Sequence, residues 1–261
     1  MEIAIWCCLL GVLLLSVSHL AFAGAPPPKL HNMRGASKFK VLNRAQMIKN
    51  AQTTLGMDLS KYNYCVAGNS GVGKSSLING LRGLTNDHTD PRVARVCERE
   101  CTRDPTPYVH PDQSHVVLWD LPGGNTLKQN AHNYFNRQVL YAFDCIIVVT
   151  ASRFTELDLE IADLAVQWEV PVFFVRNKFN IDLENYMDRH PSLDIHTAAR
   201  DLSADLQSDL REQLQNKSSR LKDRQVYFVD SKAMRPQTRL HRMDEGRLIN
   251  DVAQTAFKRR Q

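Results

Sequence analysis

The chain has 261 residues, 43% of them hydrophobic and 23% charged, which is ordinary for one large globular domain or a domain with appendages. Its formal net charge of +5 is mild and is not gathered into a long basic run, which argues against nucleic acid as a partner. An acidic membrane surface remains compatible with this charge.

Residues 3–23 form an almost unbroken apolar run, which is typical of a signal peptide or a membrane span. The small residues of Ala21-Phe22-Ala23 favour a signal peptide, and thus a secreted protein. The basic residues that follow, beginning at Lys29, favour an uncleaved anchor with the remaining chain on the cytoplasmic side of an endomembrane such as the endoplasmic reticulum. Residues 1–24 are therefore either a signal anchor or a signal peptide, and an error of the gene model is a third interpretation.

The remaining chain divides into a linker, a helix and an α/β domain. Pro26 to Pro28 stiffen the predicted linker, residues 25–41. Apolar residues at four-residue spacing predict a helix within residues 42–58. Over residues 59–261, strands alternate with amphipathic helices, as expected of a parallel sheet covered on both faces. The predicted strands are 62–68, 115–120, 144–150, 170–177 and 225–230, and the predicted helices are 74–84, 126–141, 156–168, 196–217 and 244–258.

Two groups of apolar residues in this domain are predicted to serve packing and not chemistry. A leucine stripe on the fourth helix is expected to face the core. Two cysteines inside apolar strands are expected to be buried thiols. These residues are Leu202, Leu206, Leu210 and Leu214 for the stripe, and Cys65 and Cys145 for the thiols.

A glycine-rich stretch between the first strand and the next helix fits the pattern G-x-x-x-x-G-K-[ST]. Backbone N–H groups of such a loop turn inward around a β-phosphate, and the helix amino terminus favours the anion. Lys74 is expected to bridge the β- and γ-phosphate oxygens, and Ser75 to give its hydroxyl to Mg²⁺. The predicted nucleotide-binding residues here are Gly68, Asn69, Ser70, Gly71, Val72, Gly73, Lys74, Ser75 and Ser76.

A second predicted part of the metal site is Asp120, at the carboxyl end of the strand 115–120. An acid at that place faces the crevice where open α/β sheets bind their ligands. Asp120 is predicted to hold Mg²⁺ through a water, and the Gly123 N–H to bind the γ-phosphate as part of the catalytic site. The alternative is a solvated acid at a strand end.

With GNSGVGKSSLINGLRG, WDLPG and FFVRNK in this order, the chain resembles the immunity-related GTPases, an interferon-inducible family of dynamin-like membrane GTPases. The resemblance runs from about residue 42 onward and implies a P-loop G domain that binds and hydrolyses GTP. It also implies nucleotide-dependent homodimers through the G domains and attachment to endomembranes in innate defence. By the same resemblance, Thr102 is the switch I threonine, catalytic and metal-binding. The resemblance also places Arg153 and Glu156 on a dimer-facing surface, and the alternative for these two residues is a solvated loop.

The resemblance also assigns a base-reading loop, RNKFNID, which spans Arg176 to Asp182. Asn177 is expected to tie this loop to the phosphate loop, and the Lys178 stem to lie against the purine. Where such GTPases have an Asp that reads guanine, this chain has Asn180, which costs on the order of 2–4 kcal/mol for guanine. An amide also permits a relaxed preference toward xanthine, and Asp182 substitutes only if the loop shifts.

After the last strand, Ser231 and Lys232 resemble the element whose backbone N–H reads guanine O6. Gly124 replaces the water-orienting Gln of Ras-like GTPases, so hydrolysis is expected to be slow unless a second G domain assists. The leading hypothesis is a membrane-associated GTPase that uses Mg²⁺. The alternative is a pseudo-GTPase with impaired nucleotide binding that acts as a membrane-tethered interaction module.

Overall fold

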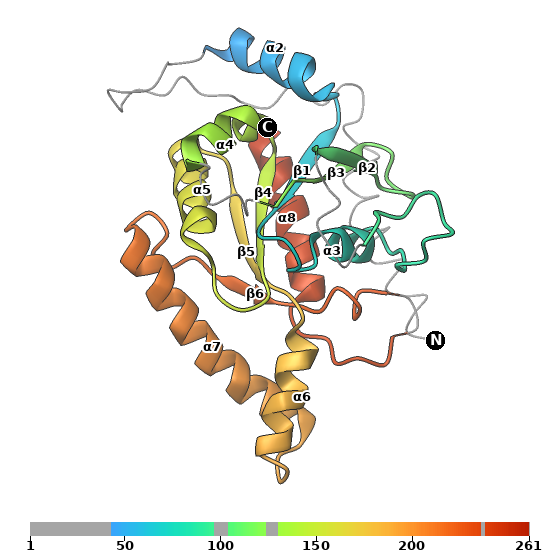
Figure 1. Ribbon diagram of the computed structural model, residues 1–261, viewed down its shortest axis with the longest axis vertical. Helices are drawn as coiled ribbons and strands as arrows, with labels where there is room; N and C mark the ends of the chain where they lie inside the picture. Colours follow the sequence, from blue (N-terminus) through green and yellow to red (C-terminus); the bar gives the residue numbers. More distant parts are fainter. Residues whose placement is uncertain (1–42, 97–103, 124–129, 236–237, 261) are drawn as a thin grey trace.

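A six-stranded sheet with the order β2-β3-β1-β4-β5-β6 forms the centre of the computed structural model, which describes residues 43–96, 104–123, 130–235 and 238–260 (Figure 1). All neighbouring strands are parallel except β2, which runs antiparallel to β3 at one edge. The strands are β1 (Tyr62–Ala67), β2 (Thr106–Val109), β3 (Val116–Asp120), β4 (Cys145–Thr150), β5 (Val172–Arg176) and β6 (Val226–Phe228).

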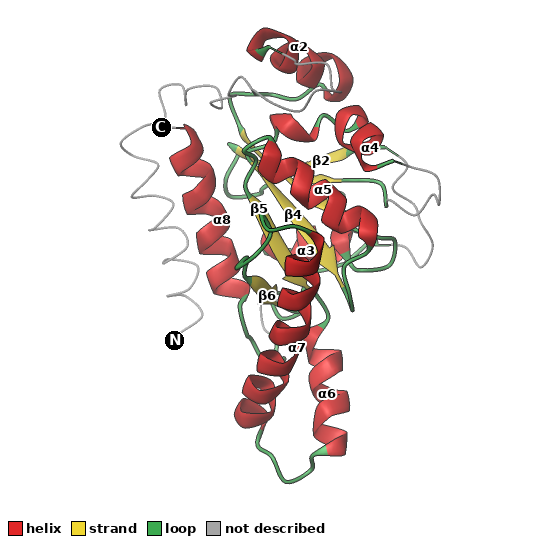
Figure 2. Ribbon diagram, turned by 90° about the vertical axis from the view of Figure 1, so that its left-hand side faces the viewer, coloured by secondary structure: helices red, strands yellow, loops and turns green. Residues whose placement is uncertain are grey.

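Helices cover both faces of this sheet, as the sequence predicts (Figure 2). Alternate strand residues point to opposite faces, so β1 and β4 contribute Val66 and Ile147 to one core and Cys65 and Ile146 to the other. The first core is closed by α3 (Lys74–Leu81) and α8 (Glu245–Arg260). The second is closed by α2 (Arg44–Leu55), α4 (Ala131–Arg137), the 3₁₀ helix η1 (Leu140–Ala142), α5 (Glu156–Gln167), α6 (Phe179–Arg189) and α7 (Ile195–Lys217).

The predicted packing residues have the expected places. Leu202, Leu210 and Leu214 of α7 are buried in the second core, and Leu206 packs against it partly exposed. Cys65 and Cys145 are buried free thiols. The leucine stripe and the strand cysteines therefore belong to the core.

Helix α2 confirms the helix predicted within residues 42–58. A capping box between Asn43 and Gln46 closes its amino terminus, and Gly56 in the left-handed conformation ends it. Met47 and Ala51 are buried against the domain, and the Asn50 amide donates to the Tyr141 hydroxyl at 3.0 Å. One face of α2 is therefore fixed to the α/β domain through η1.

The sequence pattern does not predict strand β2 and helix α6, and it predicts one continuous helix where the structure has two short ones. The helix expected at 126–141 is split into α4 and η1, because Val139 adopts a left-handed conformation with φ 53°. Strand β2 contains Pro107 and only four residues, so its alternation is weak. Helix α6 begins inside the supposed base-reading loop and runs beside α7 (Figure 1).

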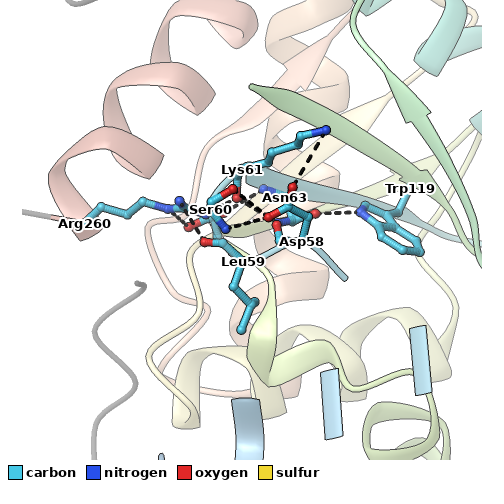
Figure 3. A network of polar contacts seen from close by, with 8 residues as sticks. Asp58, Leu59, Ser60, Lys61, Asn63, Trp119 and Arg260 are labelled. Carbon is cyan, nitrogen blue, oxygen red and sulfur yellow. Dashed lines mark hydrogen bonds and ion pairs between the residues drawn. The ribbon is translucent and has the colours of Figure 1, made fainter. Parts of the chain in front are cut away.

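At the amino-terminal end of the strands, a polar network joins segments far apart in sequence (Figure 3). The Asn63 amide nitrogen donates to the backbone oxygens of Asp58 and Lys61, and its oxygen accepts from the Trp119 indole at 2.9 Å. Arg260, from α8, donates to the backbone oxygens of Leu59 and Lys61. This network fixes the entry into β1 against α8 and β3.

No helix among the described residues is both long and apolar enough to cross a membrane. The predicted anchor or signal peptide, residues 1–24, and the predicted linker, residues 25–41, lie outside the described residues.

Candidate nucleotide-binding site

The glycine-rich loop connects β1 to α3, and its backbone requires glycine at two positions. Gly68 has φ +142°, and a Cβ there would lie 2.2 Å from the Val149 carbonyl oxygen on β4. Gly73 has φ +94°, and a Cβ there would lie 2.5 Å from the Asn177 amide nitrogen. Both contacts are closer than real Cβ atoms approach, so the loop reaches its neighbours only because these side chains are absent.

Lys74 and Ser75 open α3 at the end of this loop. Lys74 is buried, and its ammonium donates to the Asn69 carbonyl oxygen at 3.0 Å, across the loop. The Ser75 hydroxyl donates to Asp120 Oδ2 at 2.6 Å. Strands β1 and β3 are neighbours with Val66 opposite Asp120, which places the carboxylate beside the loop. The two described residues predicted to hold a metal are thus in direct contact.

The oxygens of Ser75 and Asp120 suit Mg²⁺, which prefers hard oxygen ligands and completes its shell with water and phosphate. Among the described residues, no group of three or more His, Cys, Asp or Glu side chains forms an all-protein metal site. This is compatible with a cation bound jointly by protein and nucleotide. Thr102, predicted to be the third metal-binding residue, lies outside the described residues.

Gly123 follows β3 and is partly buried, three residues after Asp120. The Tyr134 hydroxyl of α4 donates to the Pro122 carbonyl oxygen at 2.9 Å, which holds this turn beside the crevice. Gly124 lies outside the described residues, so the turn is described only up to Gly123.

Asn177 joins the phosphate loop to the loop after β6. Its side chain is fully buried, with the amide nitrogen donating to the Val72 carbonyl oxygen at 3.1 Å. The amide oxygen accepts from the Ser231 N–H at 3.0 Å. Lys178 reinforces the same junction, because its ammonium donates to the Gly71 carbonyl oxygen at 2.8 Å. The residues predicted for the two halves of the nucleotide site are therefore brought together.

Asn180 is buried in the first turn of α6, with a specific partner. Its amide nitrogen donates to the His241 carbonyl oxygen at 3.0 Å, in the loop that leads to α8. His241 packs edge-on against His196 at 5.2 Å between ring centroids, and burial together with His196 lowers the pKa of His241. No sequence feature predicts this loop, since residues 238–244 carry no motif.

Asp182 is engaged away from the base-reading position. The Arg176 guanidinium, itself buried, contacts Asp182 Oδ2 at 2.9 and 3.0 Å and also donates to the Ser152 carbonyl oxygen. A cavity of about 630 Å³ lies beside this pair, lined by residues of α6 and α7 and by none of the phosphate loop. A loop shift that brings Asp182 to the base would have to break this ion pair.

Two carboxylates that the sequence analysis did not select shape the loop after β6. The Lys232 N–H donates to Asp230 Oδ1 at 2.8 Å. Glu245, at the start of α8, accepts from the Asp230 N–H at 2.9 Å and from the Met243 N–H at 2.6 Å. Asp230 shares a sequence feature with Asp120, because each is an acid at the carboxyl end of a predicted apolar strand. Glu245 is an acid in a first helical turn, where sequence alone suggests only a helix start.

Burial of the Glu245 carboxyl raises its pKa, although the N–H groups of Asp230 and Met243 stabilise the ionised form. A second buried acid, Asp158, caps α5 by accepting from the Thr155 N–H and hydroxyl at 2.9 and 2.7 Å. Burial raises the pKa of Asp158, and the positive charge of Lys74 opposes that rise. Asp158 therefore lies within electrostatic reach of the phosphate loop.

Comparisons with known proteins agree with this geometry. The chain is 36% identical over 135 residues to "Interferon-inducible GTPase 1" of Mus musculus, covering 52% of this chain and 32% of that protein. It is 35% identical over 135 residues to "Interferon-inducible GTPase 5" of Bos taurus, covering 52% of this chain and 29% of that protein. The matched region thus spans about a third of the length of these relatives.

Among solved structures, the "LeoA bacterial dynamin GTPase from ETEC" superposes on 82% of this chain and 38% of its own, with a TM-score of 0.50 and 18% identity. At this identity the likeness supports the fold alone. The family model "Interferon-inducible GTPase (IIGP)" matches residues 34–237, which include the phosphate loop, Asp120 and the base-reading loop. The chain therefore belongs to the interferon-inducible GTPase family.

Proposed function

We propose that this protein binds Mg²⁺-GTP, hydrolyses it slowly when alone, and changes its assembly with nucleotide state. The observation that carries this proposal is the position of Asn177. One buried amide holds the Val72 carbonyl oxygen of the phosphate loop and the Ser231 N–H of the loop after β6. The phosphate-binding and base-binding halves are therefore joined by the protein's own contacts, which reduces the ordering cost of binding.

In this proposal each site residue has a defined role. Lys74 exchanges its contact with the Asn69 carbonyl oxygen for the β- and γ-phosphate oxygens. Ser75 and Asp120 would hold Mg²⁺, which would supply positive charge to the phosphate groups. The Gly123 N–H donates to the γ-phosphate.

Hydrolysis is slow in a single chain because Gly124 offers no side chain to orient the attacking water. A second G domain supplies the missing groups through a nucleotide-dependent homodimer. Arg153 has an exposed side chain and is suited to such a surface. Glu156 pairs with Lys217 of α7, so its carboxylate serves the α5–α7 contact in the monomer.

The preferred base is guanine, bound more weakly than with an Asp at position 180. Because the His241 carbonyl oxygen takes a hydrogen of the Asn180 amide nitrogen, the amide oxygen can turn to the base as an acceptor. Guanine offers donors at N1–H and the 2-amino group. The 2-oxo group of xanthine needs a donor instead, which this arrangement supplies less readily.

A titration with fluorescent mant-GDP, mant-GTP, mant-XTP and mant-ATP tests the proposal. Guanine nucleotides should bind best, Mg²⁺ should tighten GTP binding, and Lys74→Ala should abolish binding of all four. Lys222→Ala, which removes an exposed lysine remote in sequence from the loop, is the matched control and should bind as the wild type does. If the wild type binds none of these nucleotides at concentrations up to about a millimolar, the proposed enzymatic function is wrong.

Membrane association through residues 1–24, with the G domain on the cytoplasmic side, is a further part of the proposal. It is supported by the apolar run and by the basic residues that follow it. Protease treatment of microsomes should leave the G domain digestible. Protection together with a glycan at Asn216, in the glycosylation sequence Asn216-Lys217-Ser218, would instead support the secreted form. Size-exclusion chromatography with a GTP analogue tests the nucleotide-dependent dimer.

The contact between Asp230 and the Lys232 N–H favours a second candidate, a pseudo-GTPase that serves as an interaction module. That contact occupies a backbone donor of the predicted base-reading element. Under this function the titration would find no guanine nucleotide binding in the wild type, while the protein would remain folded.

A further inference from the structure

The loop after β6 has three successive backbone N–H groups that could meet the 6-oxo group of a purine, and each has an acceptor within the chain. The Ser231 N–H donates to Asn177 Oδ1 at 3.0 Å, and the Ala233 N–H to the Asp230 carbonyl oxygen at 2.8 Å. The Lys232 N–H donates to Asp230 Oδ1 at 2.8 Å. A guanine O6 must therefore displace one of these acceptors to be recognised here.

The three contacts differ in how readily they can be released. Releasing Ser231 would disturb Asn177, which also holds the phosphate loop. Releasing Ala233 would open the turn itself, because its acceptor is a backbone oxygen. The Lys232 N–H is held by the side chain of Asp230, two residues earlier in the same loop. Rotation of that side chain releases the N–H and leaves the backbone in place.

The backbone of Asp230 is fixed independently of its carboxylate. Its N–H donates to Glu245 Oε1 at 2.9 Å, and the adjacent Val229 N–H donates to the Arg176 carbonyl oxygen at 2.9 Å. The side chain of Asp230 is buried, whereas Lys232 is exposed at the rim of the site. The carboxylate can thus rotate while the backbone of this loop keeps its position.

We propose that Asp230 is a specificity-determining residue that competes with the guanine 6-oxo group for the Lys232 N–H. The inference rests on the proposed nucleotide-binding function and adds a cause of weak guanine recognition separate from Asn180. A carboxylate is a stronger acceptor than a neutral carbonyl, so guanine must displace the better partner. The negative charge also repels O6, which is itself an acceptor.

The test compares GDP with 2-aminopurine riboside diphosphate, which keeps the 2-amino group and lacks the 6-oxo group and the N1–H, and the affinity of each nucleotide is compared between the wild type and the variant. Asp230→Ala removes the competing acceptor and should tighten GDP binding by about tenfold, equivalent to ~1.4 kcal/mol. Affinity for the 2-aminopurine analogue should stay unchanged. Asp230→Asn keeps an oxygen acceptor for the Lys232 N–H without the charge, and should give a smaller gain for GDP.

Thermal unfolding identifies any variant that does not fold, and the isosteric Asp230→Asn keeps the test available if Asp230→Ala fails. Unchanged or weaker GDP binding in folded Asp230→Ala would overturn the inference, as would an equal gain for the 2-aminopurine analogue. If Asp230→Ala fails to fold, Asp230→Asn provides the test. In that case, the absence of a selective gain in GDP affinity would overturn the inference. Failure of the wild type and every variant to bind either nucleotide would instead refute the proposed function.

Discussion

Arg260 of α8 and Asp144, which immediately precedes β4, form a buried two-point ion pair between residues 116 positions apart in the chain. The guanidinium Nε donates to Asp144 Oδ1 at 2.7 Å and a terminal nitrogen donates to Oδ2 at 2.6 Å. Both side chains are almost fully buried, with exposures of 2% and 0%. The carboxylate also accepts from the Asn63 N–H at 2.7 Å, so the pair connects α8, β4 and the start of β1.

Asp144→Asn is expected to lower the free energy of unfolding by about 3–5 kcal/mol, since it leaves the Arg260 charge buried without a counter-charge. Chemical denaturation measures this change in the free energy of unfolding. Nucleotide binding at denaturant concentrations below the unfolding transition shows that the variant is folded. Asp90→Asn removes the partner of Arg92 in a surface ion pair whose side chains are 25% and 60% exposed, and should change stability little.

The paired change Asp144→Leu with Arg260→Met provides the second arm of the experiment. Replacing both charges with apolar groups should recover part of the loss, because no charge is left buried without a counter-charge, although the Asn63 N–H loses its carboxylate acceptor. A double variant as unstable as Asp144→Asn would mean that the two side chains are not energetically coupled.

Gly68→Ala is expected to abolish nucleotide binding and to destabilise the fold. The new methyl group would lie 2.2 Å from the Val149 carbonyl oxygen, so β4 or the phosphate loop must move, at a cost of about 1–3 kcal/mol. Gly71→Ala is the matched control in the same loop, since its Cβ meets nothing within 4 Å. It should cost only ~1 kcal/mol for its positive φ and should retain measurable mant-GDP binding.

Asn180→Asp is expected to have two opposing effects. The carboxylate gives guanine a second acceptor and should tighten GDP binding. In the unliganded protein it also places an acceptor opposite the His241 carbonyl oxygen, in place of the amide donor at 3.0 Å. The loss of this bond should lower the free energy of unfolding by about 1–3 kcal/mol.

Calorimetry with GDP and XDP, together with denaturation of the unliganded protein, separates the two effects of Asn180→Asp. The His241 contact is lost in the free and in the bound protein alike, so GDP affinity should rise by roughly 30- to 1,000-fold from the base contact while the free energy of unfolding falls. Unchanged GDP affinity would indicate that other groups read the base, and unchanged stability would indicate that the His241 contact is weak.

The sequence predicts the fold well where local pattern and tertiary environment agree. Buried parallel strands such as β4, CIIVVT, are continuous apolar runs, and the phosphate loop has a fixed spacing between strand and helix. Strand β2 escapes prediction because it has only four residues, one of them Pro107, so its sequence lacks a clear alternation even though it pairs with the next strand. Helix α6 escapes because its first turn overlaps a loop motif.

The contacts of the candidate site likewise fall into those that local sequence predicts and those that it does not. Ser75 and Asp120 can be predicted as partners, because each follows a recognisable strand and parallel strands align their carboxyl ends. The contacts of Asn180 with His241 and of Lys232 with Asp230 cannot, since they depend on the path of a loop without regular structure. Those contacts are the ones through which we propose that base selectivity is set, and motif spacing alone does not reveal them.

The pH dependence of stability provides a test of Glu245, whose pKa is raised by burial above the ordinary value of 4.5. A raised pKa means that the folded state keeps its proton at a pH where the unfolded state has released it. The contribution of Glu245 is therefore most favourable below pH 4.5 and is lost as the pH rises through the folded-state pKa.

Glu245→Gln removes this titration and keeps the size of the side chain. The free energy of unfolding of the wild type relative to this variant should therefore fall as the pH rises above 4.5, while acids common to both proteins cancel. Urea denaturation at several pH values measures the difference, and Glu184→Gln on the exposed side of α6 provides the baseline for removing one carboxylate. A difference that rises with pH would mean that the N–H groups of Asp230 and Met243 outweigh burial, and that Glu245 is held as a carboxylate from low pH.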